Sequence, residues 1–389
     1  MNILFLTSYF EPDLSAGSFR NTALFKALMN KVTKNDFVHV ITTMPNRYST
    51  YKVRGQEHDE GENYIIDRVP VPKHSGGMKG QIKAFMVYYK QAKKLTKGKK
   101  YGLVYASSSR LFTAFLGKRC AAKNQCPLYL DIRDIFVESI RYVYLHKPLI
   151  RVIFVFFLSR IEKYTFKNAN HINLVSKGFN YYFSRYPKPS YSYFTNGIDE
   201  EFIEARKQEV NVENNPKLIV YAGNIGKGQG LEKVIPEAAQ QLGEEYKFQI
   251  IGEGGTKELL SKKVEELGIN NVELIKPVSR NELIQYYQKA DYFFFHLNDL
   301  EHHKYVLPSK MFEYGAFDKP IIAGVAGYPR QFIETNLTNY IVFEPTNVGE
   351  FVEKFKVYEY KKEKREEFVT KFNRSNIMLA MADDILKLV

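Results

Sequence analysis

Cysteine is scarce in this chain of 389 residues, and long apolar runs are missing. The two cysteines, Cys120 and Cys126, are too few for a disulfide framework and lack CxxC spacing, which suits a reducing cytoplasm. The longest strongly apolar run covers residues 152–158, far below the roughly 20 residues that cross a bilayer. The N-terminus turns polar at Thr7, unlike an export signal. We therefore expect a cytoplasmic protein that is soluble or bound to a membrane surface.

Motifs that identify several enzyme and binding classes are also absent. The eight histidines show no HExxH spacing and no DxD pair stands near a glycine loop, so we expect neither a metal ion nor another cofactor. A Gly-x-Ser-x-Gly sequence is missing, which disfavours a serine hydrolase. Zinc-finger, RRM and KH signatures are missing too, which weakens the case for nucleic-acid binding.

The chain does have a basic excess and enough length for two domains. Lysine and arginine number 56 against 43 aspartates and glutamates, a net charge of +13, which predicts an acidic partner such as phosphate-bearing ligands, nucleic acid or an anionic membrane. Short apolar runs alternate with amphipathic stretches throughout, which is typical of βα units around parallel sheets. Two such series are separated by a polar stretch. We expect an N-terminal Rossmann-like domain at 1–199, a linker at 200–216, a C-terminal Rossmann-like domain at 217–370, and a last helix at 371–389 that packs back toward the first domain.

Residues 307–324 are the most informative run, because they are built like a loop, a short helix and a buried strand. Pro308 fits a helix start, Ser309 offers a hydroxyl, and backbone N–H groups of a first helical turn attract phosphate. Glu313 lies about one turn further on, where its carboxylate is able to accept hydrogen bonds from a ribose. The same run also fits an ordinary helix that leads into a strand, with Glu313 on the surface.

Three glycine loops each follow an expected strand, where open α/β sheets bind ligands. In the first, Gly17 and Ser18 open a helix, and either the backbone approaches a diphosphate there or Ser simply caps the helix. The second, residues 223–230, contains Lys227 and has neither dehydrogenase GxGxxG nor P-loop spacing. The third is residues 252–255, which precede a helix.

Two further segments are open to two interpretations. Asp131, Arg133, Asp134 and Glu138 follow a buried strand and serve either to orient an acceptor hydroxyl or to form an internal ion pair. Residues 142–167 mix basic and aromatic side chains, which fits a helix lying on an anionic membrane or a core helix with a solvated basic face.

Taken together, residues 196–199, 221–224 and 308–313 resemble the family-4 retaining glycosyltransferases, which have the GT-B fold. Through residues 131–138, 222–231 and 307–314 the chain resembles the bacterial surface-polysaccharide branch, for O-antigen and capsule, that includes N-acetylfucosamine transferases. The resemblance implies an α/β GT-B fold, with two doubly wound Rossmann-like domains facing across a cleft. It also implies a nucleotide-diphosphosugar donor, UDP-linked, held by the second domain and an acceptor held by the first.

The resemblance assigns roles residue by residue. Glu313 matches the glutamate that binds the donor ribose, residues 307–309 match the stretch around the diphosphate, and Gly17 matches the glycine loop that faces it. We expect donor binding by Gly17, Ser18, Asn224, Gly226, Lys227, Gly252, Pro277, Val278, Leu307, Pro308, Ser309 and Glu313, and acceptor binding by Arg133, Asp134 and Glu138.

The chain departs from the family pattern at its charged positions. Tyr305 stands where the family has its first glutamate, Asn224 replaces an arginine, and Gln229 replaces a lysine. Lys227 and Lys310 therefore become candidates for the missing positive charge, and we expect Lys227, Lys310 and Asp134 to carry catalysis.

The expected function is metal-independent hexosyl transfer in bacterial cell-surface polysaccharide synthesis, to a saccharide or polyprenyl-diphosphate-linked acceptor, at the inner face of the plasma membrane. The transferred sugar is expected to be an N-acetylated amino or deoxyamino sugar. Two alternatives stay open, a sugar-nucleotide epimerase of GT-B architecture and a basic α/β module that binds nucleic acid.

Overall fold

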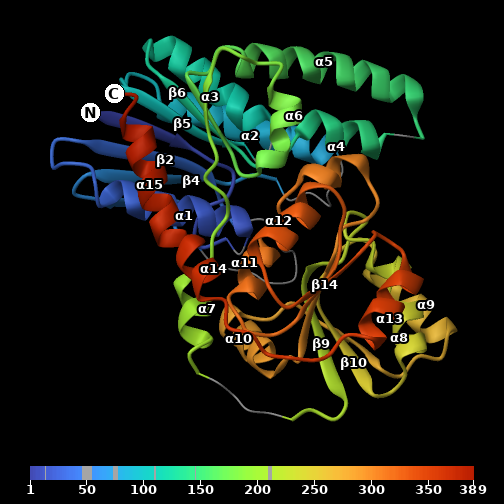
Figure 1. The fold of residues 1–389 in the computed structure, drawn as a ribbon. Coiled ribbons are helices and arrows are strands. Elements are labelled where there is room, and N and C mark those ends of the chain that lie inside the picture. Colours follow the sequence, from blue (N-terminus) through green and yellow to red (C-terminus); the bar gives the residue numbers. More distant parts are fainter. Residues whose placement is uncertain (14, 46–54, 73–77, 109–110, 145, 209–212) are drawn as a thin grey trace. The chain divides into compact units, whose positions relative to one another are not determined.

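The chain folds into two compact units, each built around its own parallel sheet (Figure 1). The computed structural model describes residues 1–13, 15–45, 55–72, 78–108, 111–144, 146–208 and 213–389. Unit 1 comprises Met1–Thr195 and Arg374–Val389, and unit 2 comprises Asn196–Asn373. Among the described residues, none of the helices combines the length and the apolar character that crossing a bilayer requires.

The sheet of unit 1 has the strand order β3-β4-β2-β1-β5-β6-β7-β8. All neighbours are parallel except β3, which pairs antiparallel with β4 at one edge. The order reverses between β1 and β5, which makes the carboxyl end of β1 a ligand-binding position for this architecture. The strands are β1 (Asn2–Leu6), β2 (Phe37–Thr43), β3 (His58–Gly61), β4 (Tyr64–Val69), β5 (Leu103–Ser108), β6 (Leu128–Ile132), β7 (His171–Leu174) and β8 (Ser190–Ser192).

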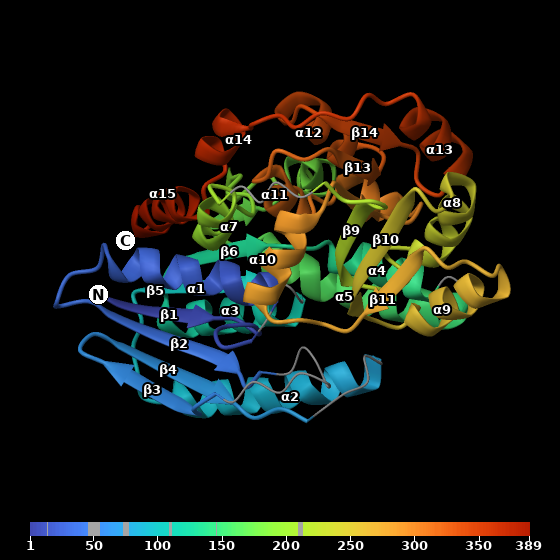
Figure 2. The same cartoon turned by 90° about the horizontal axis from the view of Figure 1, so that it is seen from below.

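Helices cover both faces of this sheet. Helix α1 (Ala16–Met29) and the C-terminal helix α15 (Arg374–Leu386) contribute apolar side chains to one core with β1, β2 and β5, and Figure 2 shows both helices on the same face, opposite α2. The last helix of the chain therefore completes the first unit. The other helices are α2 (Met78–Leu95), α3 (Leu111–Asn124), α4 (Phe136–Val143), α5 (Pro148–Phe166), η1 (Lys177–Phe179) and α6 (Asn180–Phe183).

The sheet of unit 2 is entirely parallel and has the order β11-β10-β9-β12-β13-β14. Its order reverses at β9 and β12, so the loop after β9 occupies the same topological place as the loop after β1 in unit 1. The strands are β9 (Lys217–Asn224), β10 (Tyr246–Glu253), β11 (Val272–Ile275), β12 (Tyr292–His296), β13 (Ile321–Gly324) and β14 (Tyr340–Phe343).

Aromatic side chains fill both faces of this second sheet, because successive strand residues point to opposite sides. Phe293 stacks on Tyr314 at 4.6 Å, while the next residue, Phe294, packs against Phe351 at 5.7 Å. The helices are α7 (Glu200–Ala205), η2 (Leu231–Lys233), α8 (Ile235–Leu242), α9 (Lys257–Glu266), α10 (Arg280–Lys289), η3 (Glu301–Tyr305), α11 (Lys310–Gly315), α12 (Tyr328–Asn336), α13 (Val348–Lys356) and α14 (Glu366–Lys371).

The sequence prediction of two α/β Rossmann-like folds is confirmed, and each expected strand is present. Two details differ from it. Strand β3, which is polar, was not expected. The stretch 200–216, expected as a linker, begins with helix α7 of unit 2.

Candidate donor site

The candidate donor site lies at the carboxyl ends of β9 and β10. These strands run in register to their last residues, so Gly252 pairs with Gly223 and Glu253 with Asn224. A Cβ atom on Gly252 would lie 1.8 Å from the carbonyl oxygen of Gly223, and φ is +150° and +153° at the two glycines. Only glycine fits this close contact between the two backbones and this backbone conformation. The loops that follow β9 and β10 therefore begin close together.

Lys310 lies directly against Gly223. A Cβ atom there would lie 2.3 Å from Cε and 2.8 Å from Nζ of Lys310. The Lys310 ammonium is 5.8 Å from the ring centre of Tyr221 and 6.0 Å from that of Tyr314. Burial lowers the pKa of Lys310 below its ordinary value, and the carboxylate of Glu313 offsets part of this.

Lys310 forms no salt bridge with any residue in the described ranges. A largely buried cation without an acid in contact favours an anion from outside the chain, because an unpaired charge is costly to bury. The position therefore suits a phosphate oxygen beside the Gly223 backbone.

Helix α11 carries Lys310 and Glu313 on one short element. Ser309 is its N-cap, Leu307 is buried, and Pro308 and Ser309 are partly exposed. The hydroxyl of Tyr287 donates to Glu313 Oε2 at 3.2 Å, which orients a carboxylate that is itself only partly buried. The second carboxylate oxygen remains able to accept from a ligand hydroxyl.

The loop between β9 and η2 is held by the strand ends around it. Asn298 donates through Nδ2 to the carbonyl of Lys227 at 2.8 Å, and buried His296 donates through Nδ1 to the carbonyl of Gln229 at 2.5 Å. The amide N–H of Thr346 donates to the other ring nitrogen of His296 at 2.9 Å, which fixes the neutral tautomer. Burial lowers the pKa of His296 to about 4, so the ring stays neutral near pH 7.

Within this loop the side chains of Asn224 and Lys227 are exposed, while Gly226 is buried. Asn224 donates to Gln229 Oε1 at 2.6 Å, so the two residues at which the sequence resemblance implies cations contact each other. The Lys227 ammonium has no ion pair among the described side chains and reaches solvent.

The segment at Pro277 and Val278 lies between β11 and α10, and both residues are partly buried. Ser279 caps α10 through a reciprocal capping box with Glu282, which fixes the direction of this segment.

Tyr305, which stands where the family has its first glutamate, ends the short helix η3. Its hydroxyl donates to Glu301 Oε1 at 3.1 Å, so a carboxylate lies one turn before the position at which the family places one. Glu301 also pairs with Lys304 at 2.7 Å, and both partners hold its pKa below the ordinary range.

In unit 1, the guanidinium of Arg133 lies on the backbone of Gly17. A Cβ atom on Gly17 would lie 2.2 Å from Arg133 Nη1, so a side chain at this position would displace the guanidinium. Burial lowers the pKa of Arg133 to about 10 despite the nearby carboxylate of Asp131. Ser18 is buried and its N–H donates to the Ser15 hydroxyl at 3.2 Å.

Asp131 is part of a buried ion pair with Arg20, which lies outside the segment 131–138 in which an internal ion pair was expected. Arg20 donates through Nε and Nη2 to its two carboxylate oxygens at 2.8 and 2.9 Å, and both side chains are fully buried. Asn173 adds a third bond at 2.7 Å. Arg20 also donates to the carbonyl of Thr195 at 2.6 Å, so its charge serves the fold.

Asp134 and Glu138 lie at the start of α4. Burial raises the pKa of Asp134, although the Ile135 amide and the Ser139 hydroxyl donate toward it. Glu138 pairs weakly with Arg141 at 3.6 Å. A carboxylate with a raised pKa is a candidate for orienting an acceptor hydroxyl.

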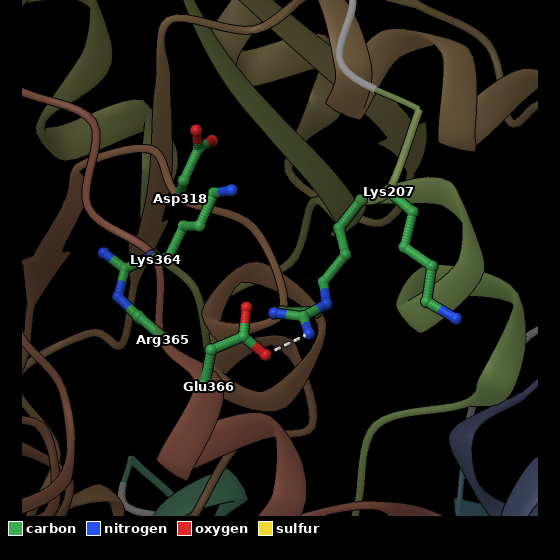
Figure 3. Close-up of a pocket in the computed structure, with 7 residues that line it drawn as sticks. Lys207, Asp318, Lys364, Arg365 and Glu366 are labelled. Atoms are coloured by element: carbon green, nitrogen blue, oxygen red, sulfur yellow. Dashed lines mark hydrogen bonds and ion pairs between the residues drawn. The ribbon is translucent and has the colours of Figure 1, made fainter.

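A cavity of about 120 Å³ on unit 2 contains none of the predicted site residues (Figure 3). Its charges are used within the fold: Arg206 pairs with Glu366 at 2.5 Å, Lys207 pairs with Glu204 at 2.6 Å, and Arg365 donates to backbone carbonyls. In the described part of the chain, no group of three or more His, Cys, Asp or Glu side chains is arranged to hold a metal.

Sequence reasoning missed the aromatic pair around Lys310. Tyr314 follows Lys310 by four residues, so the two lie on one helix face, and its hydroxyl accepts from the Ala222 N–H at 3.0 Å. The i, i+4 spacing was the available signal. No sequence signal predicts the contact of Lys310 with Gly223, because that contact depends on how α11 packs against β9.

Comparison with known proteins identifies the second unit. Residues 202–373 match the family model described as Glycosyl transferases group 1. A stretch of 71 residues is 38% identical to WcaI of Escherichia coli K12, assigned as a colanic acid biosynthesis glycosyl transferase, and covers 18% of this chain and 17% of that protein.

Solved structures agree with the fold over the whole chain. HepE of Anabaena, crystallised with UDP-glucose, superposes with a TM-score of 0.68 at 15% identity and covers all of both chains. WaaG, a glycosyltransferase involved in lipopolysaccharide biosynthesis, gives a TM-score of 0.61 at 14% identity, with 98% of this chain and 94% of that one covered. Residues 202–373 are thus similar to the group 1 glycosyltransferases, and the whole chain has the GT-B fold. These matches do not favour the epimerase or the nucleic-acid alternative.

Proposed function

We propose that this chain, whose residues 202–373 match the group 1 glycosyltransferases, transfers a sugar with retention from a nucleotide-diphosphosugar to an acceptor in bacterial surface-polysaccharide synthesis. The observation that carries the proposal is Lys310, a largely buried cation against the Gly223 backbone with no acid in contact among the described residues. A diphosphate is the ligand that such a position fits best.

The nucleotide is proposed to lie along the strand ends of unit 2. Glu313, oriented by Tyr287, accepts from the ribose hydroxyls, and the backbone at Pro277 and Val278 contacts the base. Leu307, Pro308 and Ser309 border the diphosphate. Uridine is the proposed base, since HepE binds UDP-glucose on the same fold.

Departure of the nucleoside diphosphate leaves positive charge on the anomeric carbon, so stabilising the leaving group is the main task of the protein. Lys310 stabilises the diphosphate from the buried side, and Lys227, exposed on the loop, does so from the solvent side. Retention fits attack by the acceptor on the face that the diphosphate leaves, with a leaving phosphate oxygen accepting the acceptor's proton. No metal ion is part of the proposal.

The acceptor is proposed to bind unit 1 near Gly17. Asp134 orients the attacking hydroxyl, while Arg133 and Glu138 contact neighbouring groups of the acceptor. A polyprenyl-diphosphate-linked saccharide at the inner face of the plasma membrane is the proposed acceptor, and an N-acetylated amino or deoxyamino sugar the transferred group. The similarity to WcaI and WaaG supports the polysaccharide setting.

A thermal-shift screen of UDP, GDP, ADP and their sugars tests the proposal, because a ligand that binds only the folded protein raises its melting temperature. We expect UDP to stabilise wild-type protein and to stabilise Lys310→Gln much less. Lys276→Gln, which changes an exposed lysine of the same unit, should respond like wild type. If no nucleotide shifts the melting of wild-type protein, the proposed donor site is wrong.

A further inference from the structure

The outer face of α5 changes character along its length. The first part presents Leu149, Val152 and Phe157, which are 81%, 64% and 61% exposed, with Ile153 and Phe156 beside them. At the same three-to-four-residue spacing the face continues with exposed Arg160, Lys163 and Lys167. Of the two interpretations open from the sequence, the core helix with a solvated basic face does not fit the first half, where the solvated face is apolar.

The inner face anchors the helix to unit 1. Buried residues of α5 occur only from Leu158 onward, while the start of the helix is held by Phe154, which stacks on Tyr144 after α4 at 5.4 Å. The only acid of α5, Glu162, is buried and accepts from the Tyr182 and Tyr186 hydroxyls at 2.6 and 2.9 Å. The exposed face of α5 thus combines apolar and cationic groups without any negative charge.

We infer that α5 docks this protein obliquely on an anionic lipid bilayer, with Leu149 to Phe157 in the acyl-chain boundary and Arg160 to Lys167 among the headgroups. The apolar part is about 12 Å long at 1.5 Å per residue, too short to span but suited to the interface. Arg160 lies 4.6 Å from the ring centre of Phe156, where the apolar half meets the basic half.

The charge pattern favours a bilayer over a second copy of the chain. A two-fold dimer through α5 would set the basic half either against itself or against the apolar half, and both arrangements are unfavourable. An anionic bilayer accepts both halves, because apolar side chains enter the acyl boundary while lysine and arginine meet phosphate headgroups. The docking is inferred from the α5 face alone. Its purpose, which is to bring the site to a lipid-linked acceptor, rests on the proposed function.

Vesicle co-sedimentation of the full-length protein tests the docking. Wild-type protein should bind phosphatidylcholine vesicles with one quarter phosphatidylglycerol and bind pure phosphatidylcholine less. Val152→Ser with Phe157→Ser should weaken binding about tenfold or more, and Arg160→Ser with Lys163→Ser about fivefold per charge at low salt. Lys276→Ser with Lys356→Ser, two exposed lysines of unit 2, is the matched control and should bind like wild type.

The absence of tryptophan in this chain allows a test of the orientation. Single-tryptophan variants Phe157→Trp and Tyr164→Trp should differ on adding anionic vesicles: the first shifts its emission to the blue and is quenched by acyl-brominated lipid, and the second responds weakly. Equal or reversed responses would overturn the oblique arrangement.

Two results would overturn the docking itself. One is wild-type protein that stays in the supernatant with anionic vesicles. The other is an apolar variant that loses self-association in sedimentation velocity but keeps vesicle binding, which would assign the face to a second copy. Melting temperature and UDP stabilisation are measured on each variant, so that loss of folding or failure of the donor site is seen separately.

Discussion

Arg20 and Lys310 occupy comparable places in the two units, but Arg20 forms a buried ion pair and Lys310 forms none with the described residues. Each lies beside the loop that follows the first strand of a doubly wound sheet, the position at which this architecture binds ligands. Arg20 is fully buried and bonded to Asp131 through both ends of its guanidinium. Lys310 is largely buried too, but Glu313, whose carboxylate raises its pKa, forms no ion pair with it. The first cation stabilises the fold, and the second is the one that we propose to stabilise the diphosphate of the donor.

The largest effect is expected from removing the acid of the first pair. Asp131→Ala leaves a buried arginine without its counter-charge and should lower the free energy of unfolding by about 3–5 kcal/mol. Urea denaturation followed by signals of unit 1 measures this loss. Lys26→Ala, in the same unit, is the control, since its exposed ion pair with Glu11 should contribute less than about 1 kcal/mol. A change of Asp131→Ala within the control's range would mean that the pair does not stabilise unit 1.

The same pair predicts a dependence on pH. Burial pushes the pKa of Asp131 upward, but Arg20 and Asn173 outweigh it and hold the pKa below its ordinary value. The contribution of Asp131 is therefore present above the ordinary carboxyl pKa and is lost as the pH falls through the lowered one. The difference in stability between wild type and Asp131→Ala should shrink in acid.

Lys310→Gln should act on catalysis and leave the fold intact. Loss of a charge that stabilises the leaving diphosphate is expected to lower kcat by about 10²–10³, with a melting temperature equal to or above that of wild type. Steady-state kinetics measures kcat and thermal melting measures the stability of the fold. Lys276→Gln again serves as control. Turnover within threefold of wild type would remove Lys310 from the mechanism.

Glu313→Gln should have a smaller effect, on donor binding. Weakening one or two hydrogen bonds to a carboxylate is expected to raise the KM for the donor about tenfold. A donor with 2′-deoxyribose separates the ribose role from general damage: wild type should lose affinity for it, and Glu313→Gln should lose less. Equal losses in both proteins would place Glu313 away from the ribose.

The smallest effect near neutral pH is expected in the pH dependence of kcat/KM, through the titration of the Lys310 ammonium. Since burial lowers its pKa, the ammonium should lose its charge at a lower pH than an ordinary lysine, and kcat/KM should fall on the alkaline side as it does. Lys310→Arg, which keeps its charge, should move this alkaline limb to higher pH. An unchanged limb would assign it to another group.

The sequence predicted the sheets well, because the parallel strands are short, buried apolar runs. Strand β3 was not predicted, because His58, Asp59 and Glu60 are polar. It forms by pairing with β4 at an edge of the sheet. Asp131 and Arg20 are 111 residues apart, so the sequence suggested an internal ion pair only within residues 131–138, and the pairing with Arg20 was not predicted. The character of the α5 face depends on which side packs against α3 and α4, and that is decided by tertiary structure.

The candidate site residues also divide into those that local sequence predicts and those that depend on tertiary packing. Glu313 and Lys310 stood out through local motifs, whereas the contact of Lys310 with Gly223 follows from packing of residues 87 positions apart in the chain.

Helix α15 has a consequence for how the chain is synthesised. Met378, Met381, Ala382 and Ile385 belong to the core of unit 1, so the first unit to leave the ribosome is the last to be completed. Until α15 emerges, the matching apolar strip of α1, around Leu24 and Leu28, stays uncovered while all of unit 2 is translated. Nascent unit 1 should therefore be a chaperone client for the time needed to add nearly two hundred residues, about 10–40 s at usual elongation rates.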